Sequence, residues 1–217
     1  MPGPAPKEPD ATPSPKAQRN FSDPESRIMP SSSEKGSFLQ GYNCQAAVDG
    51  EHQIIVAADV TQDTTDLRQG VRMSGQVVEN TGAAPREASM DAGYFSGAVV
   101  EALEELGCEA LVAPEKRKHR DELPPAPRGR IPSGLTLTER MRRKLSTKRG
   151  RAGYGRRKEI VEPVFGQIKQ GRGFRQFLLR GFEKVRSEWL LICTGHNLLK
   201  LWRVLGTGPP RCERVMA

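Results

Sequence analysis

Two acidic residues stand where their carboxylates could take part in chemistry. Asp91 lies in a Gly-rich turn, and Glu162 lies in a segment that predicts a helix. Lys169 follows Glu162 by seven residues, close to two helical turns, so both side chains are expected on one face. Carboxylates suit Mg²⁺ or Mn²⁺, and nearby cations attract phosphates. The pattern therefore indicates metal-assisted phosphoryl chemistry on a nucleic acid.

Positive charge is concentrated in one block of the chain. The sequence holds 34 Lys and Arg against 26 Asp and Glu, a net charge of +8. Between Glu115 and Glu159 there are 16 Lys and Arg but only 5 Asp and Glu, so the rest of the chain is slightly acidic. Such a block favours a localised surface for a polyanion. A solvated basic loop is the alternative that charge alone leaves open.

Length and composition restrict the class of protein. The 217 residues are enough for one domain with a tail. No run of about 18 apolar residues predicts a transmembrane helix, and the N-terminus lacks the layout of a signal peptide. The cysteines show no Cys-x-x-Cys spacing, so we expect reduced thiols in a cytosolic protein. They are Cys44, Cys108, Cys193 and Cys212.

The chain divides into three parts. Residues 1–37 are rich in proline and serine and are expected to be a disordered leader, within which Asn20 to Met29 could rest on the domain. Residues 38–205 are expected to form the folded domain, and 206–217 a tail. The domain pattern predicts a β-hairpin over 38–61 with its turn at Asp49-Gly50, strands over 86–90 and 109–113 paired in parallel, and helices over 65–80, 97–106, 136–146, 157–170 and 183–205. Trp189 and Trp202 are expected in the core.

Several motifs occur in an order that resembles the DDE transposases of bacterial insertion sequences. The resemblance runs from about residue 20 to residue 203. The motifs are Gly41-Tyr-Asn-Cys-Gln-Ala-Ala-Val-Asp49, Ile54-Ile-Val-Ala-Ala-Asp-Val-Thr61, Asp91-Ala-Gly-Tyr-Phe-Ser96, Val161-Glu-Pro-Val-Phe-Gly-Gln-Ile-Lys169, Arg172-Gly-Phe-Arg-Gln-Phe177 and Cys193-Thr-Gly-His-Asn-Leu-Leu-Lys-Leu-Trp202.

The resemblance implies a mixed α/β, RNase H-like fold in which helices flank a mixed sheet. It also implies two divalent ions, Mg²⁺ or Mn²⁺, held by an Asp-Asp-Glu set. Asp91 matches the second Asp of that set, at the end of a strand, and Glu162 matches the Glu, on a late helix. The implied reaction is DNA strand cleavage and transfer in DNA transposition.

The resemblance also assigns a DNA-binding group. Lys169 matches the lysine after the Glu, and Tyr154 matches the tyrosine before it. The arginine between them falls at Arg157 or Lys158, and the spacing leaves that choice open. Arg172 and Arg175, in a basic turn, are expected to bind DNA as well. The implied partner is double-stranded DNA at the ends of an insertion element. A homodimer is a further assembly compatible with this interpretation, and no membrane is implied.

The sequence departs from the family at the first catalytic Asp. That residue belongs to an opening strand, in a segment resembling Asp-Gly-Thr-Lys, and residues 1–37 contain no such strand. The usual N-terminal DNA-binding helices have no counterpart either. We therefore expect an incomplete fold that corresponds to the C-terminal portion of a transposase catalytic domain. Asp49 or Asp59 could substitute for the first Asp, although a turn already explains Asp49.

Three interpretations follow from this departure. The chain could retain metal-dependent cleavage. It could instead be a non-catalytic DNA-binding remnant that uses the basic block over residues 116–175. It could also fail to fold stably, because loss of the opening strand leaves an exposed sheet edge.

Overall fold

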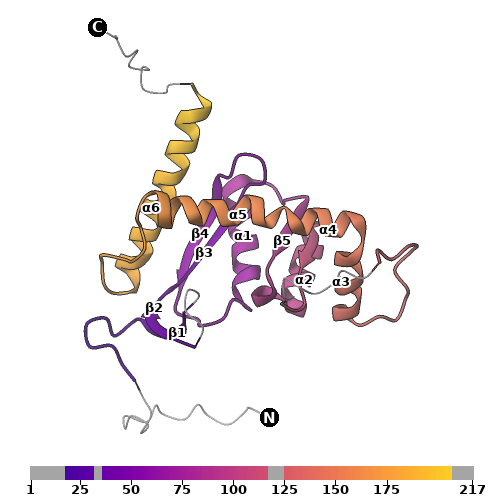
Figure 1. Ribbon diagram of the computed structural model, residues 1–217, viewed down its shortest axis with the longest axis horizontal. Coiled ribbons are helices and arrows are strands. Elements are labelled where there is room, and N and C mark those ends of the chain that lie inside the picture. Colours follow the sequence, from indigo (N-terminus) through magenta and orange to yellow (C-terminus); the bar gives the residue numbers. More distant parts are fainter. Residues whose placement is uncertain (1–17, 32–35, 117–124, 207–217) are drawn as a thin grey trace, which may run out of the picture.

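The computed structural model describes residues 18–31, 36–116 and 125–206 (Figure 1). Its strands are β1 (Arg27–Pro30), β2 (Phe38–Gly41), β3 (Asn43–Val48), β4 (Ile55–Thr61), β5 (Glu87–Met90) and β6 (Glu109–Val112). Its helices are α1 (Gln69–Thr81), the short 3₁₀ helix η1 (Ala92–Tyr94), α2 (Gly97–Glu105), α3 (Leu137–Ser146), α4 (Lys148–Gly155), α5 (Arg157–Gly166), the π-helical η2 (Gln167–Gly171) and α6 (Phe182–Val204). The mixed α/β class expected from the sequence is confirmed.

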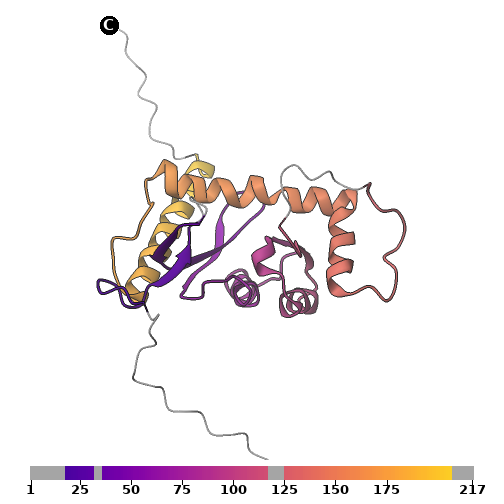
Figure 2. The ribbon, with the colours of Figure 1, turned by 60° about the horizontal axis from the view of Figure 1, so that its bottom comes forward.

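The described strands form three two-stranded sheets. Strands β1–β2 and β3–β4 are antiparallel, and β5–β6 are parallel, as the strand–helix–strand order predicts. The single mixed sheet expected from the sequence is therefore wrong for this part of the chain. Strands β3–β6 lie between α1 and α2 on one side and α4 and α5 on the other (Figure 2).

Ordered structure begins earlier than residue 38. Strand β1 lies inside the segment expected to be disordered, and its register pairs Ile28 with Gln40 and Met29 with Leu39. Asp23 is buried and accepts a hydrogen bond from the Tyr42 hydroxyl at 2.8 Å. These contacts attach residues 20–30 to the domain. Residues 1–17, 32–35, 117–124 and 207–217 lie outside the described residues.

The β3–β4 connection is longer than the two-residue turn expected at Asp49-Gly50. The amide of Asp49 donates to the carbonyl of Ile54 at 2.8 Å, so residues 50–53 form the loop. The Asp49 carboxylate accepts from the amides of Glu51 and His52. Gln53 closes the loop with φ of 58°, a left-handed conformation that few residues other than glycine adopt. A non-glycine residue in this region costs free energy, which its contacts must offset.

The contacts of Gln53 compensate for a proline inside helix α5. Pro163 has no amide hydrogen, so the carbonyl of Glu159, four residues earlier, lacks its usual intrahelical donor. The side-chain amide of Gln53 donates to that carbonyl at 2.8 Å. The carbonyl of Gln53 accepts from Nε2 of buried His196 at 2.9 Å, and its Oε1 accepts from Lys200 at 2.7 Å. One loop residue thus joins α5 to α6.

Two hydrophobic cores accompany the β3–β4 and β5–β6 sheets. The first packs β3–β4 against α5, η2 and α6, and its buried residues include Val60, Val164 and Trp189. The second packs β5–β6 against α2 and α3, and includes Leu103 and Met141. Trp202, expected in the core, is instead 36% exposed, because the end of α6 extends past the sheet. Helix α3, which packs on the second core, begins with the expected capping box of Thr136 and Glu139.

Helices α4, α5 and η2 form one nearly continuous rod over residues 148–171, which we call the helical rod (Figure 1). Helix α4 was not predicted, because three glycines weaken its helical propensity. The hydroxyl of Thr147 donates to the carbonyl of Lys144 at 2.7 Å and accepts from the amide of Gly150 at 3.0 Å. One threonine therefore ends α3 and begins α4 in a tight corner.

The cysteines behave as small core residues. Cys108 and Cys193 are buried, Cys44 is half-buried, and all three are free thiols. Burial raises the pKa of Cys193 and of Cys44 to about 12. Cys212 lies outside the described residues. None of the helices in the described ranges is long and apolar enough to cross a lipid bilayer.

The corner between α3 and α4 yields a test with a matched control in the same helix. An alanine Cβ at Gly150 would overlap the backbone of Lys144, whereas one at Gly155 would meet no atom within 4 Å. We expect Gly150→Ala to lower the free energy of unfolding by ~1–3 kcal/mol. Gly155→Ala should raise it by ~0.5–1 kcal/mol, because alanine is the better helix former. Urea denaturation measures both, and equal shifts would contradict the described corner.

Candidate active site and nucleic-acid interface

Asp91 follows strand β5 directly and caps helix η1. Its carboxylate accepts a hydrogen bond from the amide of Gly93 at 2.8 Å. The parallel pairing of β5 with β6 fixes where the strand ends and so places Asp91 at the carboxyl edge of the sheet. The sequence expectation of a strand-end carboxylate in a tight turn is met by this geometry. Asp91 is half-buried in this turn.

A second carboxylate, that of Asp66, borders the same turn. A Cβ at Gly93 would lie 2.9 Å from Oδ2 of Asp66 and 3.1 Å from Oδ1 of Asp91. The two acids therefore flank Gly93, and only a residue without a side chain fits between them. Asp66 comes from the loop between β4 and α1, and the sequence analysis did not single it out. Its distance of 25 residues from Asp91 in sequence gave no local signal.

A network of side-chain hydrogen bonds holds this turn against strand β3. The hydroxyl of Tyr94 donates to Oε1 of Gln45, which is only 2% exposed. The Gln45 amide donates to Oδ1 of Asp66 at 2.9 Å, and Asn43 donates to the same oxygen at 2.7 Å. The backbone carbonyl of Gln45 accepts from the indole of Trp189 at 3.0 Å. Gln45 therefore joins the Asp91 turn, strand β3 and helix α6.

The electrostatic setting of Tyr94 follows from this network. Burial raises the pKa of its hydroxyl above the usual value, and the carboxylates of Asp66 and Asp91 raise it further. The hydroxyl therefore stays protonated and remains the donor to Gln45 at all moderate pH values.

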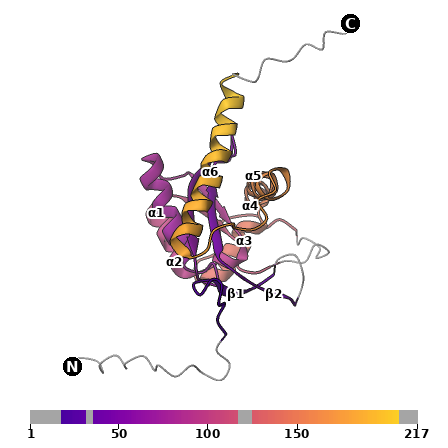
Figure 3. The ribbon, with the colours of Figure 1, turned by 90° about the vertical axis from the view of Figure 1, so that its left-hand side faces the viewer.

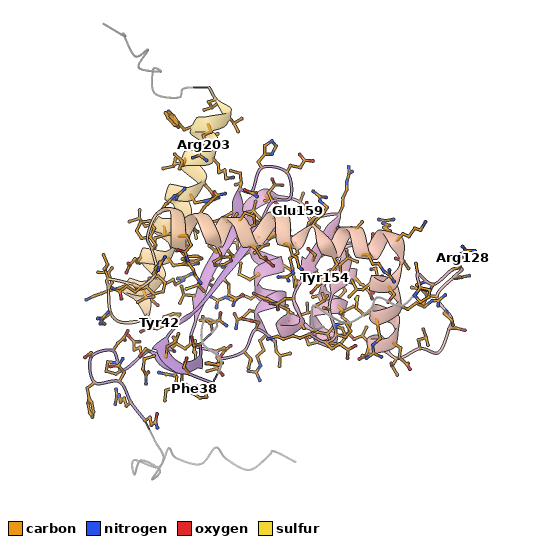
Figure 4. The ribbon with its side chains drawn as sticks, in the orientation of Figure 1. Phe38, Tyr42, Arg128, Tyr154, Glu159 and Arg203 are labelled. Carbon is orange, nitrogen blue, oxygen red and sulfur yellow. The ribbon has the colours of Figure 1, made fainter. Side chains whose placement is uncertain are left out.

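Tyr154 of α4 and Arg157 of α5 are neighbours on the helical rod. Tyr154 faces the strands from α4 (Figure 4), and burial raises the pKa of its hydroxyl, with the carboxylate of Asp91 adding to the effect. The guanidinium of Arg157 sits 5.6 Å from the centre of the Tyr154 ring. Its Nη2 lies 3.8 Å from Oε1 of Glu162, whose side chain is 58% exposed. Arg157 thus lies beside both Tyr154 and Glu162, and the carboxylate of Asp91 acts electrostatically on Tyr154.

The other expected DNA contacts lie farther along the chain. Lys158 is exposed on α5, and Lys169 is exposed on η2, where its ammonium lies 5.6 Å from the centre of the Phe165 ring. Lys169 and Glu162 thus have different partners, although the seven-residue spacing suggested one shared face. Arg175 is exposed and donates to Gln170, and Arg172 is half-buried after η2.

Two cations that the sequence analysis missed join Arg172. Lys200 and Arg203 lie on α6, and the positive charges of Arg203 and Arg172 both lower the pKa of Lys200, after burial as the main cause. The same three cations lower the pKa of His196, again after burial. Arg172, Lys200 and Arg203 therefore form a group of like charges, which we call the α6 cation group. Like charges held together are unfavourable unless a polyanion compensates them.

A comparison with models of protein families shows to which family the chain belongs. The family model described as transposase DDE domain matches residues 10–198. The chain belongs to the transposase DDE domain family. The match begins before the segment from residue 20 on which the resemblance was based. No curated protein and no solved structure shows significant similarity to the chain.

DDE transposases generally use divalent metal ions, but the donors in this transposase domain do not form a closed metal site. Within residues 18–31, 36–116 and 125–206, no three His, Cys, Asp or Glu side chains come together in a group that could hold a metal ion. The carboxylate of Glu162 faces the guanidinium of Arg157, and that of Asp66 is occupied by two amide donors. Asp91 and Glu162 alone supply too few oxygen ligands for such an ion. No catalytic step through a metal is therefore assigned.

Neither proposed substitute for the first Asp is available. Asp49 is bound to the loop amides of the β3–β4 hairpin. Asp59 is 2% exposed and pairs with Arg72 of α1 and Arg186 of α6, the latter at 2.8 Å. These pairs neutralise a buried carboxylate, which would otherwise be costly to desolvate. The expectation that Asp59 could replace the missing acid is wrong, because its oxygens hold helices in place.

Part of the basic block is neutralised within the transposase domain. Arg140 lies 3.0 Å from Glu104, Arg142 lies 3.1 Å from Glu115, and Arg149 pairs with Glu109. Two of these acids, Glu104 and Glu109, lie outside the block and could not be matched to it from the sequence. The block therefore presents less positive charge than its composition suggests.

The Tyr94–Gln45 hydrogen bond can be tested by removing one oxygen atom. Tyr94→Phe would leave Oε1 of buried Gln45 without its donor, and we expect the free energy of unfolding to fall by ~1–3 kcal/mol. Adding Gln45→Leu removes the orphaned acceptor. The double variant should therefore lose less stability than the sum of the two single variants. Chemical denaturation measures all three, and strictly additive losses would contradict the hydrogen bond.

Proposed function

We propose that this transposase-family chain binds double-stranded DNA through the α6 cation group and the exposed lysines of the helical rod. The carrying observation is that Arg172 and Arg203 both place positive charge on Lys200, an unfavourable interaction that a phosphate backbone would offset. Exposed Lys158 and Lys169, together with Arg175, extend positive charge along the rod. Contacts of this kind go to phosphates and carry little sequence preference. This is the non-catalytic DNA-binding interpretation with a changed surface, because Lys200 and Arg203 lie outside the basic block over residues 116–175 that the sequence indicated.

Metal-dependent strand cleavage and transfer at insertion-element ends is the second candidate. It is favoured by Arg157, which lies beside both Tyr154 and Glu162, and by the effect of the Asp91 carboxylate on the pKa of Tyr154. Antiparallel β3–β4 and parallel β5–β6 are compatible with parts of an RNase H-like sheet. Two Mg²⁺ or Mn²⁺ ions would need a further carboxylate from outside the described residues. Asp91 and Glu162 are the residues we assign to such a site.

If the chain binds DNA as proposed, its affinity for DNA should fall as the salt concentration rises, and Arg172 and Arg203 should set part of that dependence. We expect the double variant Arg172→Gln with Arg203→Gln to bind a DNA duplex more weakly. The slope of log K against log salt concentration should become shallower by about 2, because each lost phosphate contact contributes about 1. Fluorescence anisotropy over a salt series measures both quantities.

The control is the double variant Arg140→Gln with Arg142→Gln, which removes the same charge from arginines already paired with Glu104 and Glu115. Its slope should stay close to that of the parent chain. Equal slopes for all three proteins would refute the proposed binding surface.

Cleavage is tested separately with the intact chain and supercoiled DNA carrying the ends of an insertion element. We expect no nicking in Mg²⁺ or Mn²⁺, because the described acids are too few. Nicking that is abolished by Asp91→Asn and by Glu162→Gln, while DNA binding persists, would instead establish the catalytic candidate. Gel electrophoresis of the plasmid gives the readout. Glu188→Gln, which changes an acid that caps the amides of Leu178 and Leu179, is the matched control.

A further inference from the structure

The connection between η2 and α6 exposes aromatic, aliphatic and basic side chains together. It comprises residues 172–181, which we call the 172–181 loop. Figure 3 shows it running from the end of the helical rod to the start of α6 on the face turned toward the viewer. Phe174, Leu178 and Leu179 are 42%, 77% and 45% exposed. Phe177 packs against the first core, so the core does not explain why Phe174 points outward.

Backbone hydrogen bonds fix the start of the 172–181 loop. Gly173 has a φ of 78°, the left-handed conformation that commonly ends a helix. The amide of Phe174 then donates to the carbonyl of Ile168 at 3.2 Å. The amide of Arg175 donates to the carbonyl of Gly173 at 2.8 Å. The aromatic ring of Phe174 is therefore attached to a defined backbone position directly after the π-helical turn η2, and turns of this kind occur frequently at functional sites.

Acidic side chains around the loop bind its backbone and not its arginines. The carboxylate of Glu188 accepts from the amides at positions 178 and 179. Those of Asp23 and Glu25 accept from the amides at positions 181 and 182, where the loop meets α6, at 3.2 and 2.9 Å. Among the described residues, no Asp or Glu lies within ion-pair distance of the arginines of the loop, which are Arg172, Arg175 and Arg180. Their positive charge is therefore available to a ligand.

A ligand that fits this loop must offer negative charge and a flat apolar face side by side. A nucleic acid offers both where its bases are unpaired, because the phosphates carry the charge and each free base has an aromatic face. In a fully paired duplex the base faces are stacked on one another and are not accessible. An anionic membrane also combines charge with apolar depth, but membrane interfaces favour Trp and Tyr, and residues 172–181 contain neither.

We propose that the ring of Phe174 stacks on an unpaired base of bound DNA, while Arg172 and Arg175 bind the adjoining phosphates. This inference rests on the proposed function, because Arg172 belongs to the α6 cation group and Arg175 to the same DNA-binding surface. In a paired duplex the ring could reach a base only by separating stacked base pairs, which costs free energy. The chain should therefore bind DNA with unpaired nucleotides more tightly than the paired duplex, and Phe174 should be the cause of that preference.

The test measures the affinity of the intact chain for two labelled probes, a fully paired duplex and the same duplex with a short thymine bulge. Fluorescence anisotropy at one salt concentration gives both affinities. The parent chain should bind the bulged probe at least ~5-fold more tightly. Phe174→Ala should abolish this preference, and Phe174→Trp should keep it, because indole supplies a larger stacking surface. Phe174→Leu, which stays apolar but has no ring, should lose most of it.

The matched control is Phe38→Ala, which removes a ring that is 70% exposed on β2, outside the loop. The ratio of the two affinities should stay at the parent value. A change as large as that caused by Phe174→Ala would overturn the inference, and so would a Phe174→Ala variant that weakens binding to both probes equally. Thermal unfolding of each variant identifies losses that come from the fold, and Phe174→Leu then decides the question with the least change in packing.

The remaining outcomes separate this inference from the proposed function. A parent chain that binds both probes with equal affinity would end the inference and leave DNA binding intact, whereas no binding to either probe would end both. Co-sedimentation with vesicles of phosphatidylcholine and phosphatidylglycerol tests the membrane alternative. Vesicle binding that Phe174→Ala abolishes, in a chain without a preference for the bulged probe, would assign the 172–181 loop to a lipid surface and overturn the inference.

Discussion

The hydrogen bond from Tyr94 to Gln45 is the interaction on which the site depends, because the two halves of the domain share no strand pairing within the described residues. Each half has its own sheet and its own hydrophobic core. A polar junction can join them only if every buried group in it finds a partner. Gln45 meets that condition with both ends of its amide and with its backbone carbonyl.

This construction sets where the acids can lie. Asp91 belongs to the half that contains β5–β6, while Glu162 belongs to the helical rod that spans both halves. The charge of Asp91 acts on Tyr154, which contacts Arg157, and Arg157 in turn lies beside Glu162. The cation beside Glu162 balances its charge within the chain, and the loss of that partner would leave the acid free for other ligands. Both acids therefore have defined positions in the fold, but the described residues do not surround either of them with enough ligands for a metal ion.

Local signals in the sequence predicted local structure well. Thr136 and Glu139 specified the start of α3, and Gly82 and Gly107 ended the helices that precede them, each in a left-handed conformation. The parallel pairing of β5 and β6 followed from the intervening helix. Asp91 and Glu162 could be singled out because motifs surround them.

Long-range pairings could not be predicted in the same way. Asp59 meets Arg186 across 127 residues, and Gln45 meets Tyr94 across 49. Neither partner has an unusual local sequence, so no spacing rule identifies the pair. Helix α4 was missed because its glycines argue against a helix, whereas tertiary contact at Gly150 and Gly153 requires them. Trp202 was misplaced because apolar periodicity shows that a face is apolar but not what covers it.

The loop at Gln53 has a consequence for how this region can vary. An exposed hairpin tip ordinarily tolerates changes of length. Here one side chain substitutes for the donor that Pro163 removes from α5, while the same residue anchors His196 and Lys200 of α6. A single inserted residue would displace all three contacts at once. The tip is therefore fixed in length by a helix more than 100 residues away in sequence.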